Sequence, residues 1–556
     1  MSFFRPMMLA LLGTTMLAAP ASAVRQDRLA PQRSALADYV HARVADDLGE
    51  LSVAASGFAS AAAQNPDDRT LGLRAFRHAV SAGDMPLALK TARTLDANGS
   101  LPPDGTLLLL SDAVSRRDWK HSRALVDRID RERLFAFLSP VLRAWIAYGS
   151  RDGDPLTPLG APPAGALAAS YAAEHRALLL VATGQDMAGM AALSGLSLPE
   201  GARATRLRIA MAAVLERRHQ DSAARAVLTG EGPAIRRARA LLAEHHKLKG
   251  AIDTPAAGLA ELFVRVASDI NKDQAAPLAL HFARLATLLS PGESEAWLVC
   301  ASLLSQGDAQ EAALDALSHV SADDVFAGAV RDARVTLLMR AGRADQALAE
   351  TQAAIAAPDA STGDWARMGD LLVSAHRPAD AAAAYARALA LAGEDNAPVE
   401  MAWPLLLQRA NALLESGDWP AAKVQAKRAL VVAPQQPEVL NFLGYSEIEH
   451  GDDVDGASAM IAKASALAPD DPSITDSLGW SWYMRGNLDR AIPLLERAAQ
   501  GAPAESDINE HLGDAYWKAA RRLAARYAWR AALVVADGDQ ANRLKAKIDY
   551  GLTAKP

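Results

Sequence analysis

A repeated interval of thirty-four positions near the carboxyl end constrains this chain more than any other feature. Gly479 and Gly513 are separated by this interval (513 − 479), and each follows a leucine and precedes a bulky aromatic residue by three positions. At three further offsets both copies place apolar residues suited to a helix core: Ala491 with Ala525, Leu495 with Trp529, and Ala498 with Ala532. An earlier copy on Gly444 has its second half displaced by one residue.

Each copy predicts two helices joined by a turn. The leucine, the small residue and the bulky residue three positions on lie on one face of a helix of 3.6 residues per turn. Small residues are needed where two helix backbones cross closely, so we expect Gly479 and Ala491 to mark that crossing. Gly486 and Asn487 end the first helix. One helix pair buries too little surface to be stable alone, so neighbouring pairs must stack.

The pattern resembles the tetratricopeptide repeat, which has the same thirty-four-residue period. The resemblance implies an all-α fold, an α-α superhelix of stacked antiparallel helix pairs. In more detail the chain is similar to exported tetratricopeptide proteins of alphaproteobacteria, and more distantly to a pseudomonad lipoprotein adaptor of a carboxyl-terminal processing protease. The segments that carry this likeness are LHFARLATLLSP (280–291), NFLGYS (441–446), DSLGWSWY (476–483) and HLGDAYW (511–517).

The first 23 residues are expected to be a secretory signal peptide. Arg5 precedes an apolar run from Met7 to Ala19, and small residues lead to a cleavage site after Ala23. The alternative is a buried first helix. No cysteine follows the run, so no lipid anchor is expected, and no later run is long enough for a transmembrane anchor. These features predict a periplasmic or secreted protein.

Charge and cysteine content narrow the possible partners. The formal net charge is −7, which does not favour a nucleic-acid partner. Cys300 is the only cysteine, so no internal disulfide can form. Its apolar neighbourhood places it on the inner stripe of a first helix, where we expect a small core residue.

The regularity of the repeat suggests three regions after the signal peptide. Residues 24–150 hold TPR-like helical repeats, the first of which has Ala42 in the position of the glycine. Residues 151–257 form a degenerate helical region that begins with a loop rich in proline and glycine. Residues 258–556 form the most regular repeats and end in basic capping helices.

No catalytic or metal-binding motif stands out. The chain contains no GxxxxGK[ST], HExxH or GxSxG pattern and no paired cysteines. Glu244, His245 and His246 form the only histidine cluster, and neighbouring side chains on a helix diverge by about 100°, so we expect a solvated helix face. We therefore expect neither an enzyme nor a bound cofactor or metal.

The functional signal lies on a second stripe of the first helices, which we call the groove stripe. It consists of positions three before, one after and four after each glycine, and in tetratricopeptide proteins this face lines the concave groove. Aromatic rings alternating with carboxylates suit a protein or peptide partner. The alternative is that the rings pack against the next repeat. The stripe comprises Asn441, Tyr445 and Ile448; Asp476, Trp480 and Tyr483; and Glu510, Asp514 and Trp517.

Two functions follow as hypotheses. The first is a periplasmic scaffold or adaptor that holds a protein or peptide partner in its groove, and the lipoprotein resemblance implies a role in envelope proteolysis. The second is an assembly factor for outer-membrane proteins or for exopolysaccharide export, which would bind through the basic carboxyl end. The basic residues there are Lys518, Arg521, Arg522, Arg526, Arg530, Arg543, Lys545 and Lys547. They are either a solvated cap or a docking patch.

Overall fold

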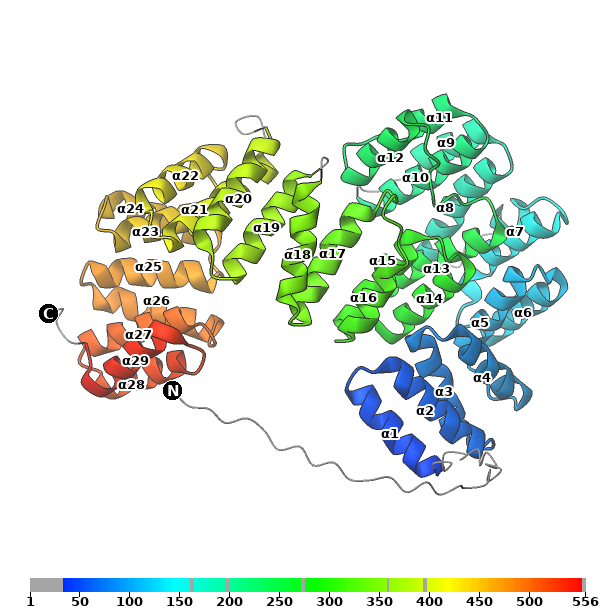
Figure 1. Ribbon diagram of the computed structural model, residues 1–556, viewed down its shortest axis with the longest axis horizontal. Coiled ribbons are helices and arrows are strands. Elements are labelled where there is room, and N and C mark those ends of the chain that lie inside the picture. Colours follow the sequence, from blue (N-terminus) through cyan, green and yellow to red (C-terminus); the bar gives the residue numbers. More distant parts are fainter. Residues whose placement is uncertain are drawn as a thin grey trace, which may run out of the picture. The chain divides into compact units, whose positions relative to one another are not determined.

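The computed structural model describes residues 34–160, 165–196, 201–271, 276–357, 360–393 and 398–552. These residues are mostly helical and include no β-strand, so the predicted all-α fold of stacked helix pairs is confirmed (Figure 1). The predicted signal peptide, residues 1–23, lies outside the described residues.

The chain forms two compact units, which we call unit 1 (Met1–Gly328) and unit 2 (Ala329–Pro556). The region boundaries expected after residues 150 and 257 concern the regularity of the repeat and stay predictions.

Unit 1 contains sixteen described α-helices and two short 3₁₀ helices. They are α1 (Ala35–Asp47), α2 (Leu51–Gln64), α3 (Arg69–Ala82), α4 (Met85–Ala97), α5 (Pro103–Ser115), α6 (Trp119–Glu132), η1 (Ala136–Leu138), α7 (Ser139–Ser150), η2 (Thr157–Gly160), α8 (Ala166–Ala182), α9 (Asp186–Ser194), α10 (Ala202–Arg217), α11 (Asp221–Val227), α12 (Pro233–Ala243), α13 (Pro255–Asn271), α14 (Ala276–Leu289), α15 (Ser294–Gln306) and α16 (Gln310–Ser318).

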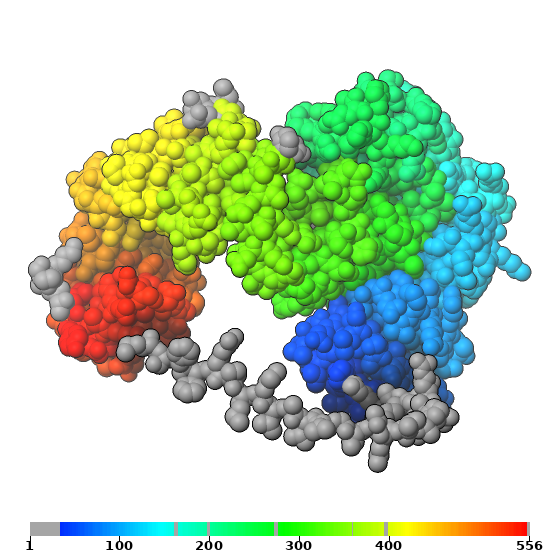
Figure 2. All heavy atoms as spheres, viewed as in Figure 1, coloured from blue at the N-terminus to red at the C-terminus, as the bar shows by residue number. Residues whose placement is uncertain are grey.

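Unit 2 contains the remaining described helices, and its atoms run in chain order from green to red in Figure 2. They are α17 (Ala327–Arg340), which begins two residues before the division, α18 (Ala344–Ala356), α19 (Thr362–Ser374), α20 (Pro378–Leu391), α21 (Val399–Glu415), α22 (Trp419–Val432), α23 (Pro437–Glu449), α24 (Val454–Leu467), α25 (Pro472–Met484), α26 (Leu488–Gly501), α27 (Ser506–Lys518), α28 (Arg522–Leu533) and α29 (Gly538–Tyr550).

The turn inside a helix pair repeats one local design. A residue with positive φ ends the first helix, and the next residue often caps the second. Gly83 has a φ of 80°, and the Asp84 side chain accepts a hydrogen bond of 3.0 Å from the amide of Leu87. In unit 2, Gly486 and Asn487 repeat this arrangement. The left-handed position costs a residue with a side chain about 1–2 kcal/mol, which favours glycine there.

The glycines of the repeat lie where the two helices of a pair cross, as predicted. A Cβ atom on Gly479 would lie 2.8 Å from Leu495 Cγ, and one on Gly513 would lie 2.3 Å from Trp529 Cδ1. Both distances are too short for a side chain. The atoms nearest to Gly479 therefore belong to Leu495, one turn beyond the expected Ala491, which is also fully buried.

Unit 2 is a one-dimensional array over its described residues. Each helix packs mainly on its neighbours in the chain, and successive first helices also touch, as α23 touches α25 and α25 touches α27. This is the contact pattern of a solenoid, in which each repeat contacts only the adjacent ones.

Unit 1 departs from that pattern because α13 and α14 pack back onto early helices. Helix α14 contacts α3 and α5, and α13 contacts α5, α7 and α8. Helices α7 and α13 approach closely, because a Cβ atom on Gly258 would lie 2.1 Å from the Trp145 ring. The stacking inferred from the repeat therefore describes unit 1 incompletely.

An ion-pair network fills the interior of unit 1 around Arg206, which is 1% exposed. Its guanidinium bonds to Glu261 at 3.1 Å, to the carbonyl oxygen of Gly250 at 3.0 Å, and to Glu293. Arg203 bonds to Glu261 and also to Glu174, which lies on α8. These groups come from α8, α10, α13 and the turn before α15, so the network joins helices that are distant in sequence.

Cys300 lies on α15 and is fully buried, as predicted, and burial raises the pKa of its thiol to about 12. None of the described helices has both the length and the apolar character needed to cross a membrane.

Candidate functional site

The groove stripe lies on α23, α25 and α27, the first helices of three consecutive pairs. Its members differ in exposure. Asn441, Tyr445, Tyr483 and Trp517 are half-buried, whereas the others are buried: Ile448, Asp476, Trp480, Glu510 and Asp514.

Trp480 is the centre of an aromatic stack. Its ring lies 4.5 Å from Tyr483 and 4.0 Å from His511, with interplanar angles of 15° and 21°. Its Nε1 donates a hydrogen bond of 2.5 Å to Glu449 Oε1, and the side chain is 9% exposed. Because both faces and the polar edge are occupied, Trp480 supports the rings that flank it.

His511 joins this stack to the polar residues of the stripe. Its Nδ1 lies 2.8 Å from Asp476 Oδ2, and its Nε2 lies 3.4 Å from the Tyr445 hydroxyl. Burial alone would lower the pKa of His511, but the Asp476 carboxylate raises it above its usual value. The ring is therefore held as a cation over a wider pH range than a free histidine.

The two carboxylates on α27 are already bonded within the chain. Glu510 accepts bonds from Arg543 at 2.8 and 3.0 Å and from Lys547 at 2.7 Å. Asp514 accepts from Lys547 at 2.6 Å and from Trp529 Nε1 at 2.8 Å. Burial opposes ionisation of Glu510, but the two cations lower its pKa to about 2. These oxygens, expected to receive donors from a partner, instead bind α29 to α27.

Trp517 lies apart from the Trp480 stack, at the end of the array. The Arg522 guanidinium lies 3.9 Å from its ring centroid, and the Trp529 ring lies at 5.3 Å. A Cβ atom on Gly551 would lie 1.8 Å from the Trp517 ring. The Trp517 ring therefore packs against α28 and against the residue that follows α29.

The sequence analysis did not assign the partners that organise the stripe, namely Glu449, His511, Arg543 and Lys547. A signal for two of them was present. Arg543 follows Glu510, and Lys547 follows Asp514, at an interval of thirty-three positions, which is close to one repeat. They therefore lie on α29, which is the next first helix after α27 in the order of the repeat.

The basic residues at the carboxyl end are largely engaged in internal contacts. The Lys518 ammonium lies 4.5 Å from the Tyr483 ring centroid. Arg526 donates a hydrogen bond of 2.8 Å to the carbonyl oxygen of Ile548, and Arg522 donates one of 2.9 Å to that of Trp517. Part of the predicted docking patch therefore stabilises the last repeat.

The histidine cluster does not lie on a helix face, so that expectation was wrong. Helix α12 ends at Ala243, and His245 has a φ of 59° in the following turn. Within the described ranges, no group of three or more histidine, cysteine or acidic side chains is placed to hold a metal ion.

No protein-family profile matches the chain, and no curated protein matches its sequence. Solved structures do resemble it. A tetratricopeptide protein of Thermus thermophilus has 19% identity and a TM-score of 0.30, and the match covers 34% of this chain and 98% of that one. The Cut9–Hcn1 hetero-tetramer of the APC/C has 13% identity and a TM-score of 0.38, with 87% and 97% covered.

YrrB, described as a tetratricopeptide protein with an unusual peptide-binding site, has 19% identity and a TM-score of 0.25, with 35% of this chain and 97% of that one covered. By its regular period, its crossing glycines and its sequential helix packing, unit 2 is an array of tetratricopeptide-type repeats.

Proposed function

We propose that this protein is an exported, non-enzymatic scaffold that holds a protein or peptide partner on the groove stripe of unit 2. The half-buried rings of Tyr445 and Tyr483 supply the contact surface. Trp480 and His511 hold them in place before binding, which reduces the entropy lost on association. Export is supported by the order of basic end, apolar run and small residues that ends at Ala23.

Two unsatisfied acceptors carry this proposal. Asn441 Oδ1 and Asp476 Oδ1 are buried and have no hydrogen-bond donor among the described residues. Buried polar atoms without partners are uncommon because each costs free energy. Both lie on the same stripe as the two tyrosine rings. Amide groups of a peptide would supply the missing donors if the stripe opened slightly around it.

Site-specific photo-crosslinking tests the proposal. A benzoylphenylalanine at Tyr483 should give covalent adducts with a partner in the cells that make the protein. Tyr550, at the end of α29 in the same unit and 76% exposed, is the matched control outside the stripe. Adducts at both positions alike, or at neither, would contradict a partner site on the stripe.

The purified partner then permits a quantitative test. Tyr483→Ala should weaken binding at least tenfold, since aromatic residues at interface centres carry much of the binding free energy. Tyr550→Ala should leave the affinity unchanged, and both variants should keep the helical circular dichroism of the parent. The groove stripe has no role in binding if Tyr483→Ala binds like the parent.

A second candidate function uses the outer face of α28. Leu523 is 67% exposed and lies on the same helix as the exposed Tyr527 and the Arg530 guanidinium, 6.0 Å from the Tyr527 ring. Such a basic and apolar face suits an assembly factor for outer-membrane proteins or exopolysaccharide export. Arg530→Glu should abolish association through this face and leave binding at the groove stripe intact.

A role as a protease adaptor rests on the lipoprotein resemblance alone, and it predicts that the crosslinked partner is a protease or its substrate.

A further inference from the structure

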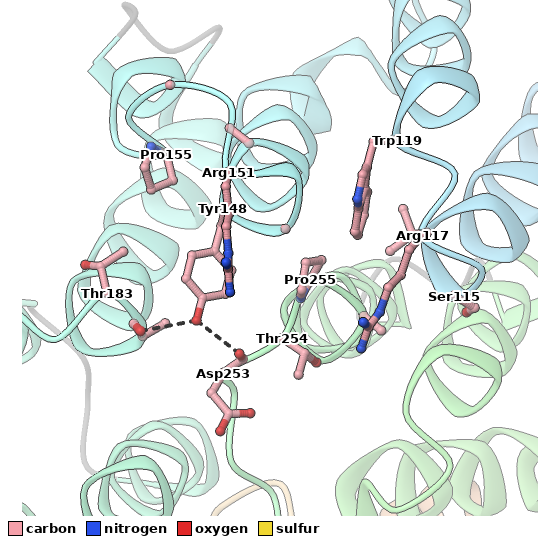
Figure 3. A pocket seen from close by; sticks show the side chains of 16 residues that line it. Ser115, Arg117, Trp119, Tyr148, Arg151, Pro155, Thr183, Asp253, Thr254 and Pro255 are labelled. Carbon is pink, nitrogen blue, oxygen red and sulfur yellow. Dashed lines mark hydrogen bonds between the residues drawn. The ribbon is translucent and has the colours of Figure 1, made fainter. Parts of the chain in front are cut away.

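A cavity of about 890 Å³ opens in unit 1 where four segments meet. They are the turn after α5, the end of α7, the end of α8 and the start of α13. Figure 3 shows Arg117 and Arg151 on either side of Pro255, with the Trp119 ring above Arg117 in this view.

The two arginines give this cavity a positive charge that the chain itself does not neutralise. Neither the Arg117 nor the Arg151 side chain makes an ion pair or hydrogen bond with any described residue. The one carboxylate that lines the cavity, Asp253, is paired with Arg217 at 2.9 and 3.1 Å. An anion entering the cavity would therefore find two free guanidinium groups.

Both arginines occupy a backbone position that favours glycine. Gly49, Gly83, Arg117 and Arg151 follow one another at the repeat interval of thirty-four positions, and their φ angles are 73°, 80°, 59° and 54°. Some other turns of the chain also have a residue other than glycine there, so the conformation alone indicates nothing. Here, however, two successive repeats direct unpaired arginines into one cavity, at a cost in stability that glycine would avoid.

The remaining walls offer donors and a flat apolar surface. The Tyr148 hydroxyl lies 3.2 Å from both the Ala182 and the Asp253 carbonyl oxygens, so it is engaged within the wall. Ser115 and Thr254 add hydroxyl groups, whereas the Thr183 hydroxyl donates to the carbonyl oxygen of Leu179 at 2.8 Å. The half-buried Trp119 ring and Pro255 supply apolar surface. A site rich in donors and poor in free acceptors suits a ligand that mainly accepts hydrogen bonds.

We propose that this cavity binds a phosphate monoester, with the doubly charged phosphate between Arg117 and Arg151 and a flat ring against Trp119. The two guanidinium groups match the charge of a dianion, and the ring accounts for the apolar wall. The site lies in unit 1 and does not depend on the groove stripe of unit 2.

Calorimetry with the full chain tests the ligand class. Phenyl phosphate should bind saturably, and its affinity should fall as salt is raised. Inorganic phosphate should bind at least fivefold more weakly because it lacks the ring, and benzoate at least tenfold more weakly because it carries one charge. Benzoate binding as tightly as phenyl phosphate would overturn the dianion site, and equal binding of inorganic phosphate would overturn the ring contact.

Glycine substitutions separate binding from folding. Arg117→Gly and Arg151→Gly should each weaken phenyl phosphate binding at least tenfold while leaving the melting temperature unchanged or higher, because glycine suits positive φ. Arg133→Gly is the matched control, since Arg133 is exposed, has a φ of 67° and lies outside the cavity. It should bind like the parent. Normal binding by the Arg117 and Arg151 variants, or equal loss in Arg133→Gly, would refute the site.

Discussion

The two units build helix pairs into different kinds of structure. In unit 2 each repeat rests mainly on its neighbours, and a spacing close to thirty-four positions recurs along much of the array. In unit 1, α13 and α14 return to α3, α5 and α7, and buried charges join helices that share no regular spacing. We infer that specific ion pairs define the packing of unit 1 where the repeat is degenerate, whereas periodicity suffices in unit 2.

The difference between the two units should appear in how far local unfolding spreads. A helix in the one-dimensional array can loosen without disturbing repeats at the far end, because its described residues contact mainly nearby repeats. The return contacts of unit 1 couple its early and late helices, so its helices should unfold together.

The largest effect is expected from Arg206→Met in unit 1. This change removes the cation beside the buried Glu293 and one of the two cations beside the buried Glu261, which should lower the free energy of unfolding by about 3–5 kcal/mol. Urea denaturation followed by hydrogen exchange, resolved to each unit, would measure it. The matched change in unit 2 is Arg543→Met. The Arg543 side chain is 54% exposed, so its replacement should lower the free energy of unfolding by less than about 1 kcal/mol. Equal losses would contradict the contrast between the units.

Two glycine substitutions compare how far a local clash spreads. Gly258→Ala drives a methyl group into the Trp145 ring, and Gly513→Ala drives one into Trp529. Each should cost about 1–3 kcal/mol. Hydrogen exchange should rise across α3, α5, α7 and α13 in the first variant, but only across α27 to α29 in the second. Gly363→Ala, which has space around it, is the control and should not destabilise. Rises confined to α13 in the first variant would show that unit 1 is no more cooperative than unit 2.

The last comparison concerns the dependence of stability on pH. Burial raises the pKa of Glu295, so folding takes up a proton and the stability of unit 1 should fall as pH rises from about 4.3 through the raised pKa. The raised pKa of His511 stabilises unit 2 fully below about pH 6.5, and this contribution is lost as pH rises through the raised pKa. Across each pH range the free energy of unfolding should change by about 1.4 kcal/mol for every pH unit that separates the unfolded and folded pKa values.

Denaturation of each unit at pH 5, 6.5 and 8 would measure both slopes. Glu295→Gln should reduce the slope of unit 1 only, where burial also raises the pKa of Glu293, and His511→Gln should reduce the slope of unit 2 only. If either substitution flattened both curves, the two units could not be treated as separate in stability.

The sequence predicted the parts of the molecule that repeat. The crossing at Gly479, the turn at Gly486 and the buried position of Cys300 all follow from offsets within one period, because a helix pair imposes the same geometry on each copy. The residues of the groove stripe lie on the first helices of three pairs, as their spacing predicted, but the internal partners of their carboxylates were not foreseen. Whether Glu510 faces a partner or Lys547 depends on how the next helix is rotated, which periodicity constrains only loosely.

The network around Arg206 could not be predicted for a different reason. Its partners Glu261 and Glu293 follow it by 55 and 87 residues, and neither interval repeats elsewhere in the network. The cavity between Arg117 and Arg151 could be predicted from the sequence only in part. The repeat spacing of the two arginines is visible in the sequence, but the return of α13 that closes the cavity is not.

The single buried thiol is a built-in probe of local opening. An alkylating reagent attacks only the exposed thiolate, so Cys300 is modified only during the moments when α15 comes away from its neighbours. Because unit 2 carries no cysteine, the rate of labelling measures how often unit 1 alone opens. The measurement uses the unaltered protein and needs no added dye.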